Sequence, residues 1–276
     1  MPRAGLAWLP SLPELYVDAA AAVPPFEWKT MDRRHFVQGC SFGAGAAVTT
    51  LSTTLQGALA GPAWAAQVTA RSYSPALLVD DQARPIKASA LRAQQNYLFH
   101  YPFEATPVFL LKLGKAALPT QLRTRGQQDY QWPGGVGPGR QLVAFSAICA
   151  HKLVYPTKDL SFISFRKGAA ANPKTPSHGE DLIHCCADHS QYDPARGAQV
   201  LGGPAEQPLC AVLLQHDAKT DTLTATGTLG GELFDDFFKK YEVKLSLDVG
   251  PKARQAVAGR STVHELDRFC RNPVRC

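Results

Sequence analysis

Two short segments of the chain each place a cysteine close to a histidine. They read ICAHKLVYP at 148–156 and IHCCADHSQYDP at 183–194. One residue separates Cys149 from His151, and two residues separate Cys186 from His189. Thiolates and imidazoles at such spacings are typical ligands of one metal centre. A fold that uses all four side chains must bring together two loops that are separated by 34 residues.

The composition indicates a globular chain with a substantial core. Of the 276 residues, 45% are hydrophobic and 19% are charged, which argues against a disordered or fibrous protein. The net charge of +6 is spread along the chain without a dense basic run, so no nucleic-acid partner is predicted. Seven unevenly spaced cysteines make a poor disulfide framework. We interpret Cys149 and Cys186 as ligands, and one bridge can still form among Cys210, Cys270 and Cys276.

The N-terminal part of the chain has the layout of an export signal. A twin arginine and a phenylalanine at 33–36 precede an uncharged stretch that closes on an A-x-A-like site at 63–65. This order is typical of a twin-arginine signal, so we expect residues 31–66 to be such a signal or a weak membrane anchor. The expected location is therefore the periplasm. Residues 1–30 do not resemble a signal, which makes Met31 a candidate start and residues 1–30 an uncertain extension that need not be translated.

From Gln67 onward the pattern is mostly strand and turn. Short apolar or alternating runs are bounded by Gly, Pro, Asp and Asn, as antiparallel strands should be. The 22 glycines and 21 prolines favour many short elements over long helices. The expected strands lie at 107–114, 141–149, 160–168, 199–203, 210–217 and 222–227. We therefore predict one all-β domain after the signal.

Two later segments differ from this pattern. The run ELFDDFFKKYEVKLSL at 232–247 is expected to begin with a short amphipathic helix. Residues 250–276 carry six Lys or Arg against two acids, and we expect them to form a peripheral tail.

The residues behind the second Cys/His segment extend its pattern. Ser190, Tyr192 and Asp193 follow His189, and the Gly/Pro-rich run GGPAEQPL occupies 202–209. Two chemistries accept two Cys and two His. One is a tetrahedral zinc site, and the other is a [2Fe–2S] cluster with two thiolates on one iron and two imidazoles on the other. Ligand type alone leaves both open.

The two segments resemble the cluster loops of the Rieske iron–sulfur family. Those loops read C-x-H and C-x-x-H, with Ser and Tyr behind the second and a Gly/Pro-rich loop over the cluster. The resemblance is specific across about 142–210 and vague elsewhere. It implies a Rieske domain at 67–276, built as an antiparallel β-sandwich with a smaller cluster-binding subdomain at about 142–210. The implied cofactor is one [2Fe–2S] cluster, with Cys149, His151, Cys186 and His189 as ligands.

The resemblance also implies roles for these residues. The two cysteines would hold the iron that stays ferric, and the two histidines would hold the iron that is reduced. Neutral imidazoles in place of anionic thiolates raise the reduction potential above that of all-cysteine ferredoxins. The hydroxyls of Ser190 and Tyr192 would donate to sulfur and raise the potential further. For Tyr192, simple core packing is the alternative.

This chain departs from the family pattern in two ways: it lacks the disulfide between the two loops, and the interval between the loops is longer. Relatives in quinol-oxidising complexes carry one extra cysteine in each loop, and these two cysteines form a bridge between the loops. Here Val154 and Asp188 occupy those places, so packing and hydrogen bonds must hold the loops. The interval of 34 residues between His151 and Cys186 is about double the usual one. The excess is polar and turn-rich, which indicates a surface excursion.

The second loop also contains two adjacent cysteines. Counting forward, Cys186 and His189 fit C-x-x-H, whereas counting back from SQYD places Cys185 at the ligand position. We choose Cys186, because the geometry of the cluster sets the spacing of its ligands. Cys185 is then expected to be a thiol beside the cluster.

A cluster of this kind implies one-electron transfer, so we expect an electron-transfer subunit of an exported respiratory oxidoreductase rather than a stand-alone enzyme. The segment at 96–116 resembles the early strands of the small subunit of arsenite-oxidase-like molybdenum enzymes. The implied partners are a molybdenum-containing large subunit and a c-type cytochrome. The alternative is the quinol-oxidising Rieske subunit of a cytochrome bc complex, with cytochrome b as partner. An exported zinc-stabilised β binding module is the alternative from another class.

Overall fold

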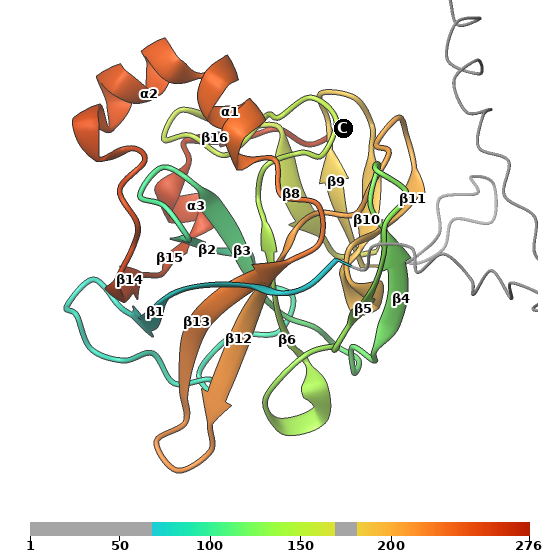
Figure 1. Ribbon diagram of the computed structural model, residues 1–276. Coiled ribbons are helices and arrows are strands. Elements are labelled where there is room, and N and C mark those ends of the chain that lie inside the picture. The colour runs from blue at the N-terminus through green and yellow to red at the C-terminus, as the bar shows by residue number, and fades with distance from the viewer. Residues whose placement is uncertain (1–67, 169–180) are drawn as a thin grey trace, which may run out of the picture. The chain divides into compact units, whose positions relative to one another are not determined.

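The computed structural model describes residues 68–168 and 181–276 (Figure 1). The expected signal at 31–66, the extension at 1–30 and most of the surface excursion lie outside the described residues. Within the described part, no helix combines the length and the apolar character needed to cross a membrane.

Strands are the predominant regular structure of the described chain and helices are few and short, which confirms the all-β prediction. The strands are β1 (Arg71–Val79), β2 (Tyr97–His100), β3 (Pro107–Lys112), β4 (Thr120–Arg123), β5 (Asp129–Trp132), β6 (Leu142–Ser146), β7 (Leu160–Ser161), β8 (Ile163–Arg166), β9 (Leu182–Cys185), β10 (Gln191–Asp193), β11 (Gln199–Gly202), β12 (Ala211–Asp217), β13 (Thr222–Leu229), β14 (Gly259–Thr262), β15 (His264–Glu265) and β16 (Asn272–Pro273). The helices are α1 (Phe234–Lys240), α2 (Glu242–Asp248) and α3 (Leu266–Phe269), with 3-10 turns at Pro138–Arg140, Pro194–Arg196 and Gly250–Lys252. Every expected strand has a counterpart, although the run at 160–168 is divided between β7 and β8.

Eight strands form one sheet in the order β14-β1-β13-β12-β6-β3-β2-β15. Neighbours in this sheet are antiparallel except β1 and β14, which pair in parallel. The two edge strands, β14 and β15, are separated in the chain only by Val263. Across the gap between the edges, the Ser261 hydroxyl donates to the His100 carbonyl at 2.8 Å and accepts from the His100 N–H at 3.2 Å. The sheet therefore curls towards a barrel.

The central strands of the large sheet are buried on both faces. In β3, Val108 and Leu110 belong to one hydrophobic cluster, whereas Phe109 and Leu111 belong to another. Successive side chains of a strand point to opposite faces, so one strand supplies two cores. This double burial explains why β3 reads as the nearly continuous apolar run PVFLLK instead of an alternating one.

A smaller sheet in the order β11-β10-β9-β8 packs against one of these two cores (Figure 1). Phe165, Ile183 and Tyr192 of this sheet share a cluster with Phe109 and Phe145 of the large sheet. The small sheet lies within 142–210, where the sequence places a separate subdomain. A curled large sheet and a small sheet that shares its core thus make up the expected two-part β architecture.

The expected amphipathic helix is present as α1 and is followed directly by α2. Phe234, Phe237 and Phe238 of α1 are buried, and the ring of Tyr155 packs edge-on against Phe237 with ring centroids 4.9 Å apart. Tyr155 belongs to the loop after β6, which also carries Cys149. The helix therefore supports one of the two Cys/His loops through aromatic packing.

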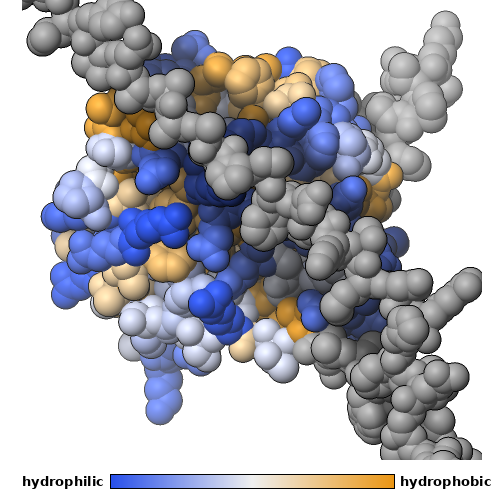
Figure 2. Space-filling view, turned by 45° about the horizontal axis from the view of Figure 1, so that its top comes forward, coloured by the Kyte–Doolittle hydropathy of each residue, from blue (hydrophilic) through white to orange (hydrophobic). Residues whose placement is uncertain are grey.

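The molecular surface shows no single continuous apolar area in the view of Figure 2, where hydrophobic residues are scattered among hydrophilic ones. On α2, the side chains of Val243 and Leu247 are 76% and 81% exposed. A pair of exposed apolar residues is common on protein surfaces and does not by itself define a binding site.

The C-terminal residues 250–276 are part of the fold, in contrast to the peripheral tail that the sequence suggests. They supply β14 to an edge of the large sheet, and they supply β16, which pairs in parallel with β7. Cys276 forms a disulfide with Cys186, 90 residues earlier in the chain. The pairing run GRST of β14 shows no apolar alternation, so no sequence pattern reveals this strand.

Replacing Cys276 with serine should lower the free energy of unfolding by about 2–4 kcal/mol under oxidising conditions, because the long cross-link restricts the unfolded chain. Denaturant unfolding of both proteins, with and without a reducing agent, measures the difference. The reducing agent should bring the wild-type protein to the stability of the variant. If the stability of the wild-type protein did not respond to the reducing agent, the disulfide would not contribute as we expect.

Candidate metal centre

The first Cys/His loop begins directly after β6 with a tight turn. The Cys149 N–H donates to the Val154 carbonyl at 2.9 Å, and the Leu153 N–H donates to the Cys149 carbonyl at 3.0 Å. Cys149 is fully buried, whereas His151 lies at the exposed rim with 35% of its side chain accessible. The turn therefore presents a thiol to the interior and an imidazole to the surface.

The second Cys/His loop is the turn of the hairpin formed by β9 and β10. The Cys185 N–H donates to the Ser190 carbonyl at 2.9 Å and closes the turn. Inside it, the Ser190 N–H donates to Asp188 Oδ1 at 3.0 Å, which holds the Asp188 carboxylate over the loop. His189 has a φ of 61°, in the left-handed region that residues other than glycine adopt only in a few per cent of cases.

The pleat of β9 decides which of the adjacent cysteines faces Cys149. Ile183 and Cys185 are buried in the core that the two sheets share, whereas His184 between them is only half-buried. Side chains alternate along a strand, so Cys185 points to the core and the next residue, Cys186, turns away from it.

Three donor groups from the two loops meet at the edge of this core, and the imidazole of His151 lies beside one of them. The Sγ atoms of Cys149 and Cys185 and a carboxylate oxygen of Asp188 lie within 4.8 Å of one another. The Cys149 thiol donates to Asp188 Oδ2 at 3.3 Å, and His151 Nδ1 lies 2.9 Å from the same oxygen. The centre thus combines two thiols, one imidazole and one carboxylate.

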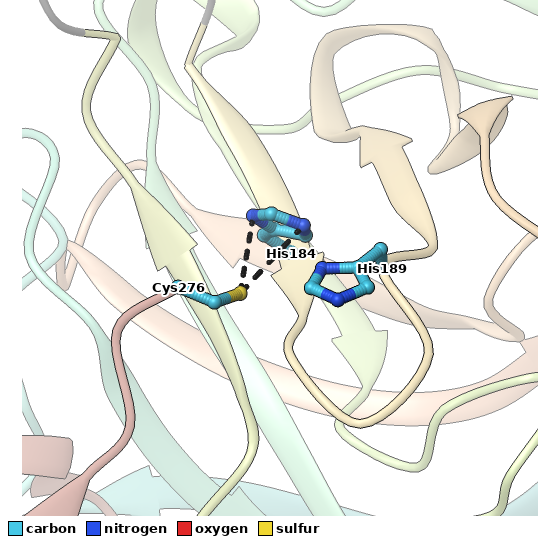
Figure 3. Close-up of side chains that lie close together, drawn as sticks. All are labelled: His184, His189 and Cys276. Carbon is cyan, nitrogen blue, oxygen red and sulfur yellow. Dashed lines mark hydrogen bonds between the residues drawn. The ribbon is translucent and has the colours of Figure 1, made fainter.

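The expected ligands Cys186 and His189 do not join this group in the structure. Cys186 is bonded to Cys276, and the ring of His189 lies beside that of His184, with ring centroids 6.0 Å apart (Figure 3). Cys185, expected only as a neighbouring thiol, takes the position opposite Cys149. The physical reason is the alternation of side chains along β9, which spacing within the motif does not express.

Asp188 is the member of the centre that sequence reasoning did not propose as a ligand. A signal for it was present. If Cys185 is the cysteine of C-x-x-H, then Asp188 occupies the place of the histidine, with Ser190 and Tyr192 behind it. The same backward count that singles out Cys185 therefore also singles out Asp188.

The surroundings favour negative charge at the centre. A hydrogen bond from Cys185 is the main cause that lowers the pKa of Cys149 to about 7; burial opposes the shift, and the Tyr192 hydroxyl supports it. The pKa of Cys185 is raised, because this thiol donates to Cys149 and is itself buried. Cys149 is therefore the member of the pair that more readily becomes a thiolate and accepts from Cys185; its contact with Asp188 as a donor belongs to the thiol form.

Asp188 is ionised even though only 3% of its side chain is exposed. Burial by itself would raise the pKa of this carboxyl. The hydrogen bond from the Ser190 N–H, together with those from Cys185, His151 and Cys149, outweighs burial and holds the pKa at about 2.

Tyr192 and Ser190 stand behind the donors in the second loop. The Tyr192 hydroxyl lies 3.5 Å from Cys149 Sγ and accepts a hydrogen bond from the Ala150 N–H at 3.2 Å, so its own proton is available to the sulfur. The Tyr192 ring is also part of the core. Tyr192 is thus placed both to contact the cysteine sulfur and to pack in the core, the two roles that the sequence suggested. The Ser190 hydroxyl accepts from the Ala205 N–H at 3.2 Å and ties the loop to the Gly/Pro-rich run.

The Gly/Pro-rich run passes over the second loop at backbone contact distance. Gly203 has a φ of 84°, and a Cβ atom at this position would lie 2.5 Å from the Ser190 Cα and 2.7 Å from the His189 carbonyl oxygen. Only glycine allows this approach, because any side chain would collide with backbone atoms that cannot move cheaply.

The donor set fits a transition-metal centre. Two thiolates, an imidazole and a carboxylate satisfy a tetrahedral zinc ion. They equally supply two sulfur ligands to one iron and a nitrogen and an oxygen ligand to the other iron of a [2Fe–2S] cluster. In either case Cys149, His151, Cys185 and Asp188 are the residues that would hold the metal.

A scan against protein-family models finds no match. Among solved structures, the chain is similar to the soluble domain of the Rieske protein II (soxF) from Sulfolobus acidocaldarius. The identity is 24%, the match covers 56% of this chain and 78% of that chain, and the TM-score is 0.38.

Replacing Gly203 with alanine should destabilise the protein by about 1–3 kcal/mol and weaken metal retention, because the added methyl group pushes the Gly/Pro-rich run off the second loop. Thermal unfolding and the metal content after dialysis measure the two effects. Gly202→Ala is the matched control: its nearest neighbour would be Gln191 Oε1 at an ordinary 3.6 Å. Equal behaviour of the two variants would contradict this close approach.

Proposed function

We propose that this protein is a one-electron carrier with a Rieske-type [2Fe–2S] cluster, and that Cys149, His151, Cys185 and Asp188 are the ligands. The observation that carries the proposal is the convergence of two loops, one after β6 of the large sheet and one between β9 and β10 of the small sheet. They bring Cys149, Cys185 and Asp188 together, with His151 in contact with Asp188. The resemblance of the loops to C-x-H and C-x-x-H, with Ser190 and Tyr192 behind the second, supports a cluster over a single metal ion.

The positions of the donors suggest how they divide between the two irons. Cys149 and Cys185 are fully buried and would hold the inner iron, whereas His151 lies at the rim and would hold the outer iron together with Asp188. When bound, the cluster accepts and returns one electron. The charge of Asp188 makes the centre more negative than one with two neutral imidazoles, and this should lower the reduction potential.

Asp188 and Tyr192 act on the proposed centre in opposite directions. A carboxylate ligand adds negative charge and opposes electron uptake. The Tyr192 hydroxyl, 3.5 Å from Cys149 Sγ, stabilises negative charge on that sulfur and favours electron uptake. The chain's own residues would therefore set the potential by a balance between an anionic ligand and a neutral hydrogen-bond donor.

For the cellular role, we propose a subunit of an exported respiratory oxidoreductase. The twin-arginine layout at 31–66 supports export of an already folded protein to the periplasm, which suits a metal site assembled beforehand. The proposed partners are a molybdenum-containing large subunit, which the resemblance at 96–116 favours, and a c-type cytochrome. The alternative is the quinol-oxidising subunit of a cytochrome bc complex.

The decisive experiment is metal and sulfide analysis of the purified protein, joined to electron paramagnetic resonance (EPR). We expect two irons and two acid-labile sulfides per chain, a coloured oxidised form and an EPR signal that appears on reduction. A colourless, EPR-silent protein with one zinc ion would overturn the proposal and favour a zinc-stabilised β module.

Variants at Asp188 should identify it as a ligand. Asp188→Ala should abolish cluster binding, because one iron loses a ligand. Asp188→His should keep the cluster and raise its potential, because a neutral imidazole replaces an anion. Iron content and redox titration measure these effects. The adjacent His189→Ala is the matched control and should keep a normal cluster. Loss of iron in this control, with retention in Asp188→Ala, would show that His189 is the ligand, as the motif spacing predicts, and that Asp188 is not.

Tyr192→Phe should leave the cluster in place and lower its reduction potential. Loss of a hydrogen bond that is stronger in the reduced state by about 1 kcal/mol corresponds to roughly 40 mV for a one-electron couple. Redox titration followed by EPR measures the shift. An unchanged potential would leave Tyr192 with core packing alone.

A further inference from the structure

A second group of metal-ligating side chains lies on the other face of β9, away from Cys185. Nitrogen atoms of His184 and His189 and the Sγ atom of Cys276 lie within 4.8 Å of one another (Figure 3). Cys276 Sγ is 3.9 Å from each ring nitrogen of His184. The Sγ atom of Cys186 is bonded to that of Cys276, which brings a fourth sulfur or nitrogen donor next to this group.

Two imidazoles and two thiolates form a common tetrahedral donor set for zinc. A disulfide does not supply that set, because the thiolate and not the oxidised sulfur is the metal ligand. We propose that His184, His189, Cys186 and Cys276 form a redox-gated site for a divalent cation of the zinc type: the site binds the cation when the Cys186–Cys276 disulfide is reduced, and the disulfide closes it.

The chemistry balances with a dithiol as the reductant. The dithiol delivers two electrons and two protons, the S–S bond between Cys186 and Cys276 breaks, and the dithiol becomes a disulfide. The cation then displaces the two thiol protons and forms two metal–thiolate bonds, while His184 and His189 bind as neutral imidazoles. The product is a site with two sulfur and two nitrogen ligands.

The structure holds the C-terminal segment in place independently of the disulfide. β16 pairs with β7, and the Val274 N–H donates to the Ser161 carbonyl at 2.8 Å. The Arg166 guanidinium donates to Cys186 Sγ at 2.6 Å and to the Val274 carbonyl at 3.2 Å. The same guanidinium donates to the Cys276 carbonyl at 2.5 Å. After the S–S bond breaks, these contacts keep both sulfurs beside the histidines, so that little entropy is lost when a cation binds.

The second group is also open to solvent and separate from the first centre. His189 and Cys276 are exposed and His184 is half-buried, whereas Cys149 and Cys185 are fully buried. A cation can therefore reach the second group without passing the proposed cluster. None of the four donors of the second group belongs to the four that we assign to the cluster, so the two proposals stand on different residues.

The test measures zinc bound to the full-length protein in its oxidised form and after reduction by a phosphine, with the phosphine removed under anaerobic conditions. Equilibrium dialysis followed by elemental analysis should find one more zinc per chain in the reduced protein than in the oxidised protein. His184→Ala and His189→Ala should each weaken this binding at least tenfold. Cys276→Ser should abolish the difference between the two redox states.

A variant without the first centre separates this proposal from the proposed function. Cys149→Ser combined with Cys185→Ser should lack iron and still bind zinc only after reduction. Cobalt added to this colourless variant should give the thiolate charge-transfer bands of a tetrahedral site. If this variant does not fold, His184→Ala with its cluster intact serves the same purpose, since it should keep iron and lose the extra zinc.

Three results would overturn the redox-gated site. Equal zinc binding by the oxidised and reduced proteins would show that the disulfide does not control it. Wild-type zinc affinity in His184→Ala and His189→Ala would show that the imidazoles are not ligands. Loss of iron instead of zinc in His189→Ala would assign that imidazole to the first centre.

Discussion

The buried contact between the thiols of Cys149 and Cys185 is the interaction on which the rest of the site depends. It exists because β6 of the large sheet and β9 of the small sheet pack on one shared core, so that the loops at their ends converge. Burial disfavours a thiolate here, but a hydrogen bond from Cys185 outweighs it and lowers the pKa of Cys149. Asp188 and His151 then close the centre from the solvent side.

The pleat of β9 places two different chemistries on the two faces of one strand. Cys185 faces the buried centre, and His184 faces the surface group with Cys276. The turn that follows contributes Asp188 to one side and His189 to the other. A short hairpin thus contributes donors to the buried centre and to a second group whose donors are half-buried or exposed.

The contacts that support the two loops come from distant parts of the chain. Packing of α1 against Tyr155 holds the first loop, and Gly203 lets the Gly/Pro-rich run press on the second. The C-terminal segment adds the Cys186–Cys276 disulfide and its link to Arg166. These contacts hold the two loops in place, although the sequence has no cysteine pair at the positions that would join the loops to each other.

The sequence by itself determined the all-β class, most strands, the helix at 234–240 and the two loops that carry the donors, because these depend on local periodicity and spacing. It also identified Cys149 and His151 as candidate ligands, because the first loop contains no second cysteine or histidine. Only the tertiary structure showed that Cys185, and not Cys186, lies opposite Cys149, and that Cys276 reaches the second loop. The reason is physical: the face on which a side chain lies is set by strand pairing, and contacts 90 residues apart leave no trace in local spacing.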